Sequence, residues 1–166
     1  MVSLDVGCGV NKRGDIGIDY SKKSHADVIA DSHFLPFKDN IFDKVVSVTV
    51  FEHSPNVLNF LKEQARVLKQ HGTVEMCTDN AQYYNFSVMQ LGKGGILHEN
   101  FHKDHYAIFF PKNVERLMRL AGLTVKRVDY QSSRKSKADV AAKMLVRLRV
   151  WRKNCLYDRF MVIGTK

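Results

Sequence analysis

The segment "LDVGCGVNKRGDIGIDYS" (residues 4–21) decides the fold of this chain. An apolar run leads into Gly7-Cys8-Gly9, and a second short run at 16–19 ends on Asp19. Two glycines directly after a strand let the backbone turn tightly and pass close to a ligand, because no Cβ stands in the way. Open α/β sheets bind ligands at this place, at the carboxyl ends of their strands. The segment therefore predicts a ligand-binding turn.

Short apolar runs of the β type recur along the remaining sequence, and two helical patterns lie between them. Several runs are continuously apolar, as expected for parallel strands that are buried on both faces. The predicted strands cover 2–6, 16–19, 27–30, 43–50, 72–78, 123–130 and 157–165, and the predicted helices cover 56–70 and 111–121. Strands that alternate with helices predict one α/β domain over residues 1–166, with a mainly parallel sheet in three layers.

The first half of the chain leaves little room between its strands. Nine residues separate Val6 from Ile16, and seven separate Asp19 from Asp27. Parallel neighbours usually need a crossover of a dozen residues or more, so these shortened crossovers should be loops or single turns. We therefore expect one sheet face near the N-terminus to be thinly covered, which favours a partner or a second copy in a homo-oligomer.

Two nucleotide-like cofactors can be weighed against the glycine turn. A dinucleotide needs a third glycine, a helix N-terminus for its pyrophosphate and an acid about 20 residues further on. Val10, Asn11 and Lys12 stand where that glycine should fall, and Asp19 follows Gly9 by only ten residues. S-adenosylmethionine has no phosphate and needs a close turn, an acid for its ribose hydroxyls and an apolar slot for adenine. The residues favour S-adenosylmethionine.

Four ordered motifs carry a family resemblance: "LDVGCG", "GIDYS", "ADSHFLPFKDNIFDKVVSVTVFEH" and "ARVLKQHGTVEM". Together, over roughly residues 3–80, they resemble the class I S-adenosylmethionine-dependent methyltransferases, in particular the type-11 group. A weaker similarity continues through "HENFHKDHYAIFFPKNVERLMRLAGLTVKRV". The resemblance implies a Rossmann-like three-layer sandwich whose last strand is antiparallel, and a transferase that uses S-adenosylmethionine.

The resemblance also implies a set of cofactor contacts. Asp5, Gly7 and Gly9 would line the methionine part, and Asp19 would bind the ribose hydroxyls. Tyr20 would flank the adenine, and Asp31 and Ser32 would contact its edge. Phe51, Glu52 and His53 would face the sulfonium and the methyl acceptor. The cofactor-binding set is therefore Asp5, Gly7, Gly9, Asp19, Tyr20, Asp31, Ser32 and Phe51.

The segment 79–110 is predicted to form the acceptor pocket. Its lining candidates by position are Tyr83, Tyr84, His98, His102, His105 and Phe109. His53 and His105 are the candidate catalytic residues, since a histidine can take the acceptor's proton as a general base. His98, His102 and His105 would share one face of a helix and suggest a metal site, but the glycines at 92, 94 and 95 disfavour that helix. We predict no metal, and surface histidines remain the alternative.

The positive charge is concentrated near the C-terminus. The net charge is +9, and residues 134–153 hold eight Lys or Arg against one Asp. This basic insert, residues 132–156 between the last two strands, also carries Val140, Met144, Leu148 and Trp151 at near-helical spacing. It predicts a solvated helix packed on the domain, or a surface for an anionic partner, either RNA or an anionic membrane. A non-catalytic methyltransferase-fold subunit that binds RNA or membrane is therefore the alternative function.

Other features exclude some classes of protein. No apolar run reaches the roughly 18–20 residues that span a bilayer. The three cysteines, Cys8, Cys77 and Cys155, are odd in number and far apart, so we expect a reducing, cytoplasmic location. Enzymes that methylate exocyclic amines of nucleic-acid bases carry [DN]-P-P-[YF] after the fourth strand, whereas this sequence has "FEHSP" at that place. P-loop and G-x-S-x-G motifs are also absent from the sequence. The methyl acceptor is not named by these residues: small molecules, lipids and RNA stay open.

Overall fold

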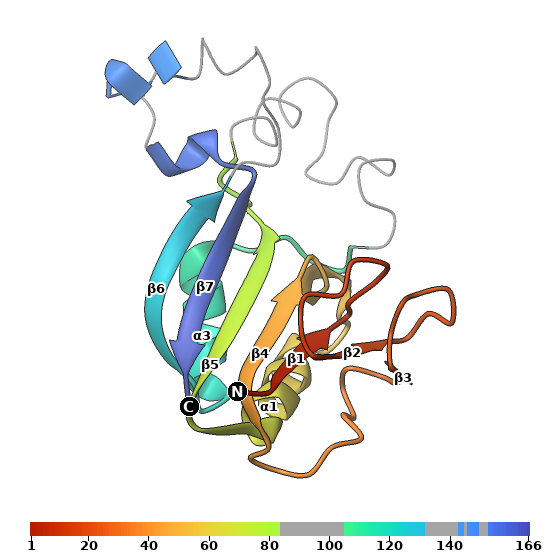
Figure 1. Cartoon of the computed structure of the whole chain (residues 1–166). Helices are drawn as coiled ribbons and strands as arrows, with labels where there is room; N and C mark the ends of the chain where they lie inside the picture. The colour runs from red at the N-terminus through yellow and green to blue at the C-terminus, as the bar shows by residue number, and fades with distance from the viewer. Residues whose placement is uncertain (84–104, 132–142, 145, 150–152) are drawn as a thin grey trace.

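The computed structural model describes residues 1–83, 105–131, 143–144, 146–149 and 153–166. Its centre is one sheet in the order β3-β2-β1-β4-β5-β7-β6 (Figure 1). The strands are β1 (Ser3–Val6), β2 (Ile16–Asp19), β3 (Val28–Ile29), β4 (Phe42–Val48), β5 (Leu68–Asp79), β6 (Thr124–Gln131) and β7 (Arg159–Thr165). Neighbours pair in parallel except at β7, which runs antiparallel to both β5 and β6. The predicted Rossmann-like α/β sheet with an antiparallel last strand is confirmed.

The two predicted α-helices are present as α1 (Val57–Val67) and α3 (Pro111–Leu120). The predicted helix over 56–70 extends three residues too far at its C-terminal end, because Leu68 already pairs with Phe42 of β4. Leu68 is fully buried and is the first residue of β5. Its backbone therefore pairs within the sheet and does not continue the helix. The side chain of Asn56 caps the start of α1 by accepting the backbone N–H of Asn59.

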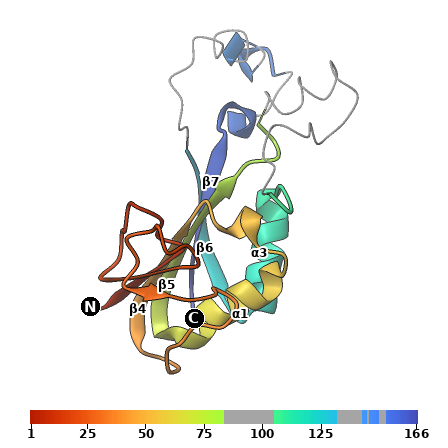
Figure 2. The ribbon, with the colours of Figure 1, turned by 90° about the vertical axis from the view of Figure 1, so that its right-hand side faces the viewer.

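Both α-helices pack against the same face of the sheet (Figure 2). The main core lies between them and the strands, and its largest fully buried side chains include Phe42, Phe51, Phe60 and Phe160. Up to Gln131, the described residues place no α-helix on the opposite face, and the crossovers between β1, β2 and β3 are loops, as predicted. No described helix is long and apolar enough to cross a membrane.

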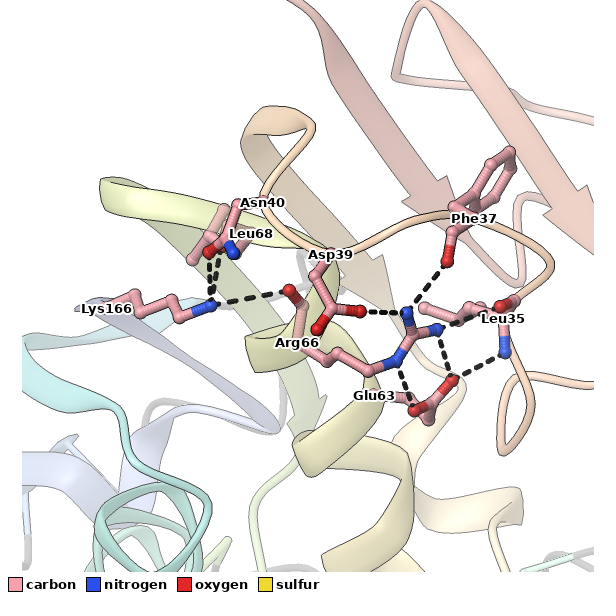
Figure 3. Close-up of polar contacts among 8 residues, drawn as sticks. All are labelled: Leu35, Phe37, Asp39, Asn40, Glu63, Arg66, Leu68 and Lys166. Atoms are coloured by element: carbon pink, nitrogen blue, oxygen red, sulfur yellow. Dashed lines mark hydrogen bonds and ion pairs between the residues drawn. The ribbon is translucent and has the colours of Figure 1, made fainter.

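A polar network around Arg66 fixes the long connection from β3 to β4 (Figure 3). The guanidinium of Arg66 donates to the Glu63 carboxylate, to Asp39 and to the carbonyl oxygens of Leu35 and Phe37. Glu63 in turn accepts the backbone N–H of Leu35. These two carboxylates raise the pKa of the Arg66 guanidinium. The network anchors residues 35–39 to α1 and so fixes the chain that follows the third strand.

Arg66→Ala should therefore destabilise the fold. The substitution removes the guanidinium donor from two carbonyl oxygens and from the partly buried Glu63, and hydrogen bonds to charged groups contribute about 1.5–3 kcal/mol. We expect a loss of that size in the free energy of unfolding, measured by urea denaturation. The control is Arg119→Ala, which removes an exposed i,i+4 pair with Glu115 and should change stability by less than about 0.5 kcal/mol. Equal losses in both variants would contradict the anchoring role.

Candidate active site

A pocket of about 810 Å³ opens at the carboxyl ends of β1, β2 and β4. This volume lies in the range of pockets that bury a cofactor-sized ligand. The backbone after β1 forms one wall, the ends of β2 and β3 form the second, and the turn after β4 forms the third. Predicted cofactor residues that line it are Gly7, Gly9, Asp19, Tyr20, Asp31 and Ser32, together with the predicted catalytic residue His53.

Gly7 lets β1 and β4 end close to each other at the pocket wall. Its φ of +70° lies in the left-handed region that favours glycine. A Cβ built on Gly7 would lie 2.4 Å from Cγ2 of Val50, which is shorter than any normal contact. The backbone N–H groups of Gly7 and Cys8 both donate to the carbonyl oxygen of Ile18, so the turn is tied to β2.

Asp19 holds the other side of the same turn. Its Oδ2 accepts the backbone N–H of Gly9 at 2.8 Å, and its Oδ1 accepts that of Ser21 at 2.7 Å. A carboxylate has about four lone-pair sites, so two further donors can still be accepted. Asp19 therefore positions the glycine turn and also presents acceptor capacity to the pocket.

Two predicted cofactor contacts, Asp5 and Phe51, are buried and do not line this pocket. Asp5 is fully buried, and its Oδ2 accepts the backbone N–H of Arg13 at 2.6 Å, which fixes the loop after β1 from below. Burial raises the pKa of the Asp5 carboxyl. Phe51 is also fully buried and packs against Phe60 and Phe109, so its apolar ring is used by the core.

His33 belongs to the pocket although the sequence analysis did not select it. The Asp31 carboxylate accepts the backbone N–H of His33 at 2.8 Å and contacts its Nδ1 at 2.7 Å. These contacts, the backbone one first, lower the pKa of Asp31. Nε2 of His33 is 2.7 Å from Oγ of Ser54, which follows the turn after β4. The His33 ring thus links two walls of the pocket. In the sequence, its position directly after Asp31-Ser32 is the feature that could have identified it as a pocket residue.

A second polar cluster lies where the turn after β4 meets the segment before α3. The turn is η1 (Phe51–His53), and the backbone N–H of Tyr106 donates to the carbonyl oxygen of Glu52. The rings of His53 and His105 lie perpendicular with centroids 4.5 Å apart. The buried Glu52 accepts a hydrogen bond from Oγ1 of Thr78 at 2.9 Å. The structure therefore brings together the two predicted catalytic histidines, which are 52 positions apart in the sequence.

Only some of the other predicted acceptor residues lie within the part of the chain that the structure describes. Phe109 is 7% exposed and packs on Phe51, so its ring belongs to the core. Tyr83 lies just beyond β5, where its backbone N–H donates to the carbonyl oxygen of Asn80. Tyr106, which lines the pocket, was missed. Tyr84, His98 and His102 lie outside the described residues.

The basic insert is described only in part. Met144 and Leu148, from its predicted apolar stripe, are 62% and 61% exposed, which corrects the expectation that they pack on the domain. Val140 and Trp151 lie outside the described residues. Near its end, η2 (Lys153–Leu156) leads into β7. The side chain of Asn80 donates to the carbonyl oxygens of Asn154 and Tyr157, which joins the insert to the end of β5.

Comparisons with known proteins agree with this geometry. Residues 15–76 match a family model described as a methyltransferase domain. A protein of Methanocaldococcus jannaschii is 30% identical over 105 residues, which are 55% of this chain and 42% of that relative. The chain thus spans about two fifths of the length of the curated relative it matches.

Three solved structures share the fold. A chain from the complex between the Haloferax volcanii Trm112 methyltransferase activator and a methyltransferase superposes with a TM-score of 0.68 and 20% identity, over 98% of this chain and 80% of that one. An S-adenosylmethionine-dependent methyltransferase of Thermotoga maritima gives 0.71 and 18%, over 99% and 82%. Phosphoethanolamine N-methyltransferase 2 of Haemonchus contortus, solved with S-adenosyl-L-methionine, gives 0.65 and 16%, over 99% and 48%.

The sheet order and the superpositions show that the chain has the fold of class I S-adenosylmethionine-dependent methyltransferases. Residues 15–76 match the methyltransferase-domain family of type 11, in agreement with the resemblance predicted from the four motifs.

Gly7→Ala should damage the turn more than Gly9→Ala. Both residues have positive φ, which costs a non-glycine residue about 1–2 kcal/mol, but only Gly7 faces Val50. We expect Gly7→Ala to lower the free energy of unfolding by more than about 2 kcal/mol, and Gly9→Ala by about 1 kcal/mol. The double variant Gly7→Ala/Val50→Ala should recover part of the loss, as measured in a double-mutant cycle. Additive losses would show that Val50 does not set the requirement.

Asp5→Asn tests the structural role of the buried carboxyl through pH. Burial raises the folded-state pKa of the Asp5 carboxyl above 3.8, so this carboxyl ionises at lower pH in the unfolded state than in the folded state. Its contribution to the free energy of unfolding therefore falls as pH rises above that value. The free energy of unfolding of Asp5→Asn, minus that of the wild type, should therefore increase as pH rises above about 4.

The control has the opposite sign. Ser3 lowers the pKa of the exposed Asp15, so Asp15 contributes stability that is lost as pH falls below its ordinary pKa. The same difference for Asp15→Asn should fall as pH rises through that window. A flat profile for Asp5→Asn would contradict the assigned effect of burial.

Proposed function

We propose that this protein binds S-adenosylmethionine in the 810 Å³ pocket and transfers its methyl group to a nucleophilic acceptor. The observation that carries the proposal is the Asp19 carboxylate, which is fixed by Gly9 at the end of β2 and keeps acceptor capacity toward the pocket. The bound S-adenosyl-L-methionine in the Haemonchus contortus structure supports the choice of cofactor.

The pocket residues suit the parts of this cofactor in order along the wall. The methionine part would lie against the backbone of Gly7 and Gly9, where no Cβ obstructs it. The Asp19 carboxylate would accept hydrogen bonds from the two ribose hydroxyls. Asp31 and Ser32 would receive the adenine edge, beside Tyr20. This arrangement would place the sulfonium methyl toward His53, at the wall formed by the turn after β4.

The reaction would be an in-line displacement at an already activated methyl group. The protein would contribute mainly alignment of acceptor and sulfonium, which can be worth about 7–11 kcal/mol. His53 and His105 would lie on the acceptor side, and a histidine base contributes on the order of 10²–10⁴-fold. We propose that residues 79–110 form the acceptor site within a single domain that spans residues 1–166.

The exposed positive insert supports a proposed anionic partner. Lys143, Arg147 and Arg149 lie beside the exposed Met144 and Leu148, a combination that suits RNA or an anionic membrane surface. The Haloferax volcanii structure shows a methyltransferase chain in complex with an activator, which supports partners in this class. All three cysteines are free thiols, which supports a reducing, cytoplasmic location.

Asp19→Asn tests the cofactor assignment. Replacing the carboxylate removes charged hydrogen bonds to the ribose, each worth about 1.5–3 kcal/mol, so we expect the Kd for S-adenosylhomocysteine to rise tenfold or more. Isothermal titration calorimetry measures this Kd. The control is Asp129→Asn on β6, which removes an exposed pair with Arg127 far from the pocket and should leave the Kd unchanged. Unchanged affinity in Asp19→Asn, or no binding by the wild type, would contradict the proposal.

A further inference from the structure

Three potential metal ligands converge beside the proposed cofactor pocket. One carboxylate oxygen of Glu52 and one ring nitrogen each of His53 and His105 lie within 4.8 Å of one another. Glu52 and His53 come from η1 after β4, whereas His105 comes from the segment that leads into α3. No sequence motif joins them, because the fold brings the two segments together through the hydrogen bond from Tyr106 to Glu52.

Only one of the two carboxylate oxygens of Glu52 has a hydrogen-bond partner among the described residues. Glu52 is 1% exposed, and Thr78 donates to its Oε2. Its Oε1 is buried and has no hydrogen-bond partner among the described residues. A buried, unpaired carboxylate oxygen is costly, and proteins usually compensate such a group with a cation or a metal ion. Both nearby imidazoles are nitrogen donors, so the cluster offers what a metal ion requires.

We propose that Glu52, His53 and His105 bind one divalent transition-metal ion of the zinc type. Two imidazole nitrogens and one carboxylate form the donor set of catalytic zinc sites, which keep a further position open. Nitrogen-rich sites favour Zn²⁺, Co²⁺ or Fe²⁺, whereas Mg²⁺ and Ca²⁺ prefer oxygen donors. The ligand atoms already lie within 4.8 Å of one another, and a rotation of the exposed His53 side chain would adjust them to metal bonds of about 2.0–2.2 Å.

Two neighbouring residues can position these ligands. Thr78 fixes the Glu52 carboxylate through the 2.9 Å hydrogen bond. Oδ2 of Asp79 lies 3.9 Å from Nδ1 of His105, so Nε2 of His105 would be the ligand atom. A carboxylate behind a ligating histidine is a common arrangement, because it orients the ring and raises its basicity. Nε of Arg159 lies 3.5 Å from Oδ1 of Asp79, so its positive charge compensates the negative charge of that carboxylate.

The role of the ion rests on the proposed function and specifies its substrate class. His53 and Tyr106 both line the cofactor pocket, so an ion at this cluster would lie at the acceptor end. An acceptor hydroxyl bound at the open position would have a lowered pKa and release its proton to solvent. The oxygen would then attack the methyl carbon while the C–S bond breaks toward sulfur, giving a methyl ether and the neutral thioether. The site therefore favours an oxygen acceptor, and both histidines act as metal ligands instead of as general bases.

Zinc affinity of the whole chain tests the site without any methyl acceptor. Competition with a chromophoric zinc chelator gives the Kd of the wild type and of Glu52→Gln, His53→Ala and Thr78→Val. We expect the Kd to rise at least about 10- to 100-fold in all three, since even the loss of a supporting hydrogen bond has that effect. The control is His25→Ala, an exposed histidine after β2, which should bind zinc like the wild type. Excess Mg²⁺ should not compete.

The outcomes separate the metal site from the proposed function. Equal zinc affinity in the wild type and His53→Ala would overturn the site, and His53 is exposed, so this variant should fold even if Glu52→Gln does not. Circular dichroism checks folding of each variant. Binding of S-adenosylhomocysteine is measured separately on zinc-free protein. If that binding is absent while the zinc pattern holds, the proposed function fails and the metal site stands.

Discussion

The close approach of Gly7 to Val50 is the constraint on which the rest of the site depends. Because no side chain fits between the ends of β1 and β4, the turn after β1 can fold back over β2 and be held there by Asp19. The buried Asp5 carboxylate fixes the loop after β1 by accepting the backbone N–H of Arg13. The same few contacts that close this end of the sheet thus also create a hollow with bare backbone on one side and a carboxylate on the other.

The turn after β4 links this hollow to the acceptor side. Its first residue, Phe51, is a core side chain, while the next two, Glu52 and His53, meet His105 at the pocket wall. The turn is therefore anchored by apolar packing on one side and presents polar chemistry on the other. Anchoring of the β3–β4 connection by Arg66 and the contact of Asn59 with the His33 carbonyl oxygen fix the opposite wall in the same way.

The sequence predicted the parts of the structure that depend on local patterns. Strand positions, the loop crossovers and the position of Gly7, Gly9 and Asp19 at a pocket follow from apolar runs and glycine spacing. The sequence did not distinguish side chains exposed in a pocket from those buried in the core, so it did not predict the burial of Asp5, Phe51 and Phe109. Tertiary contacts such as those of His33 with Ser54 and of His53 with His105 have no signal in spacing, because distant segments supply the partners.

The most direct measurement of the account is a crystal structure of the protein soaked with S-adenosylhomocysteine. The account predicts an ordered nucleoside in the pocket, with both ribose hydroxyls within hydrogen-bonding distance of the Asp19 carboxylate and the adenine beside Asp31 and Ser32. The thioether sulfur should point toward His53. A nucleoside bound elsewhere, or a pocket that stays empty after soaking, would contradict it.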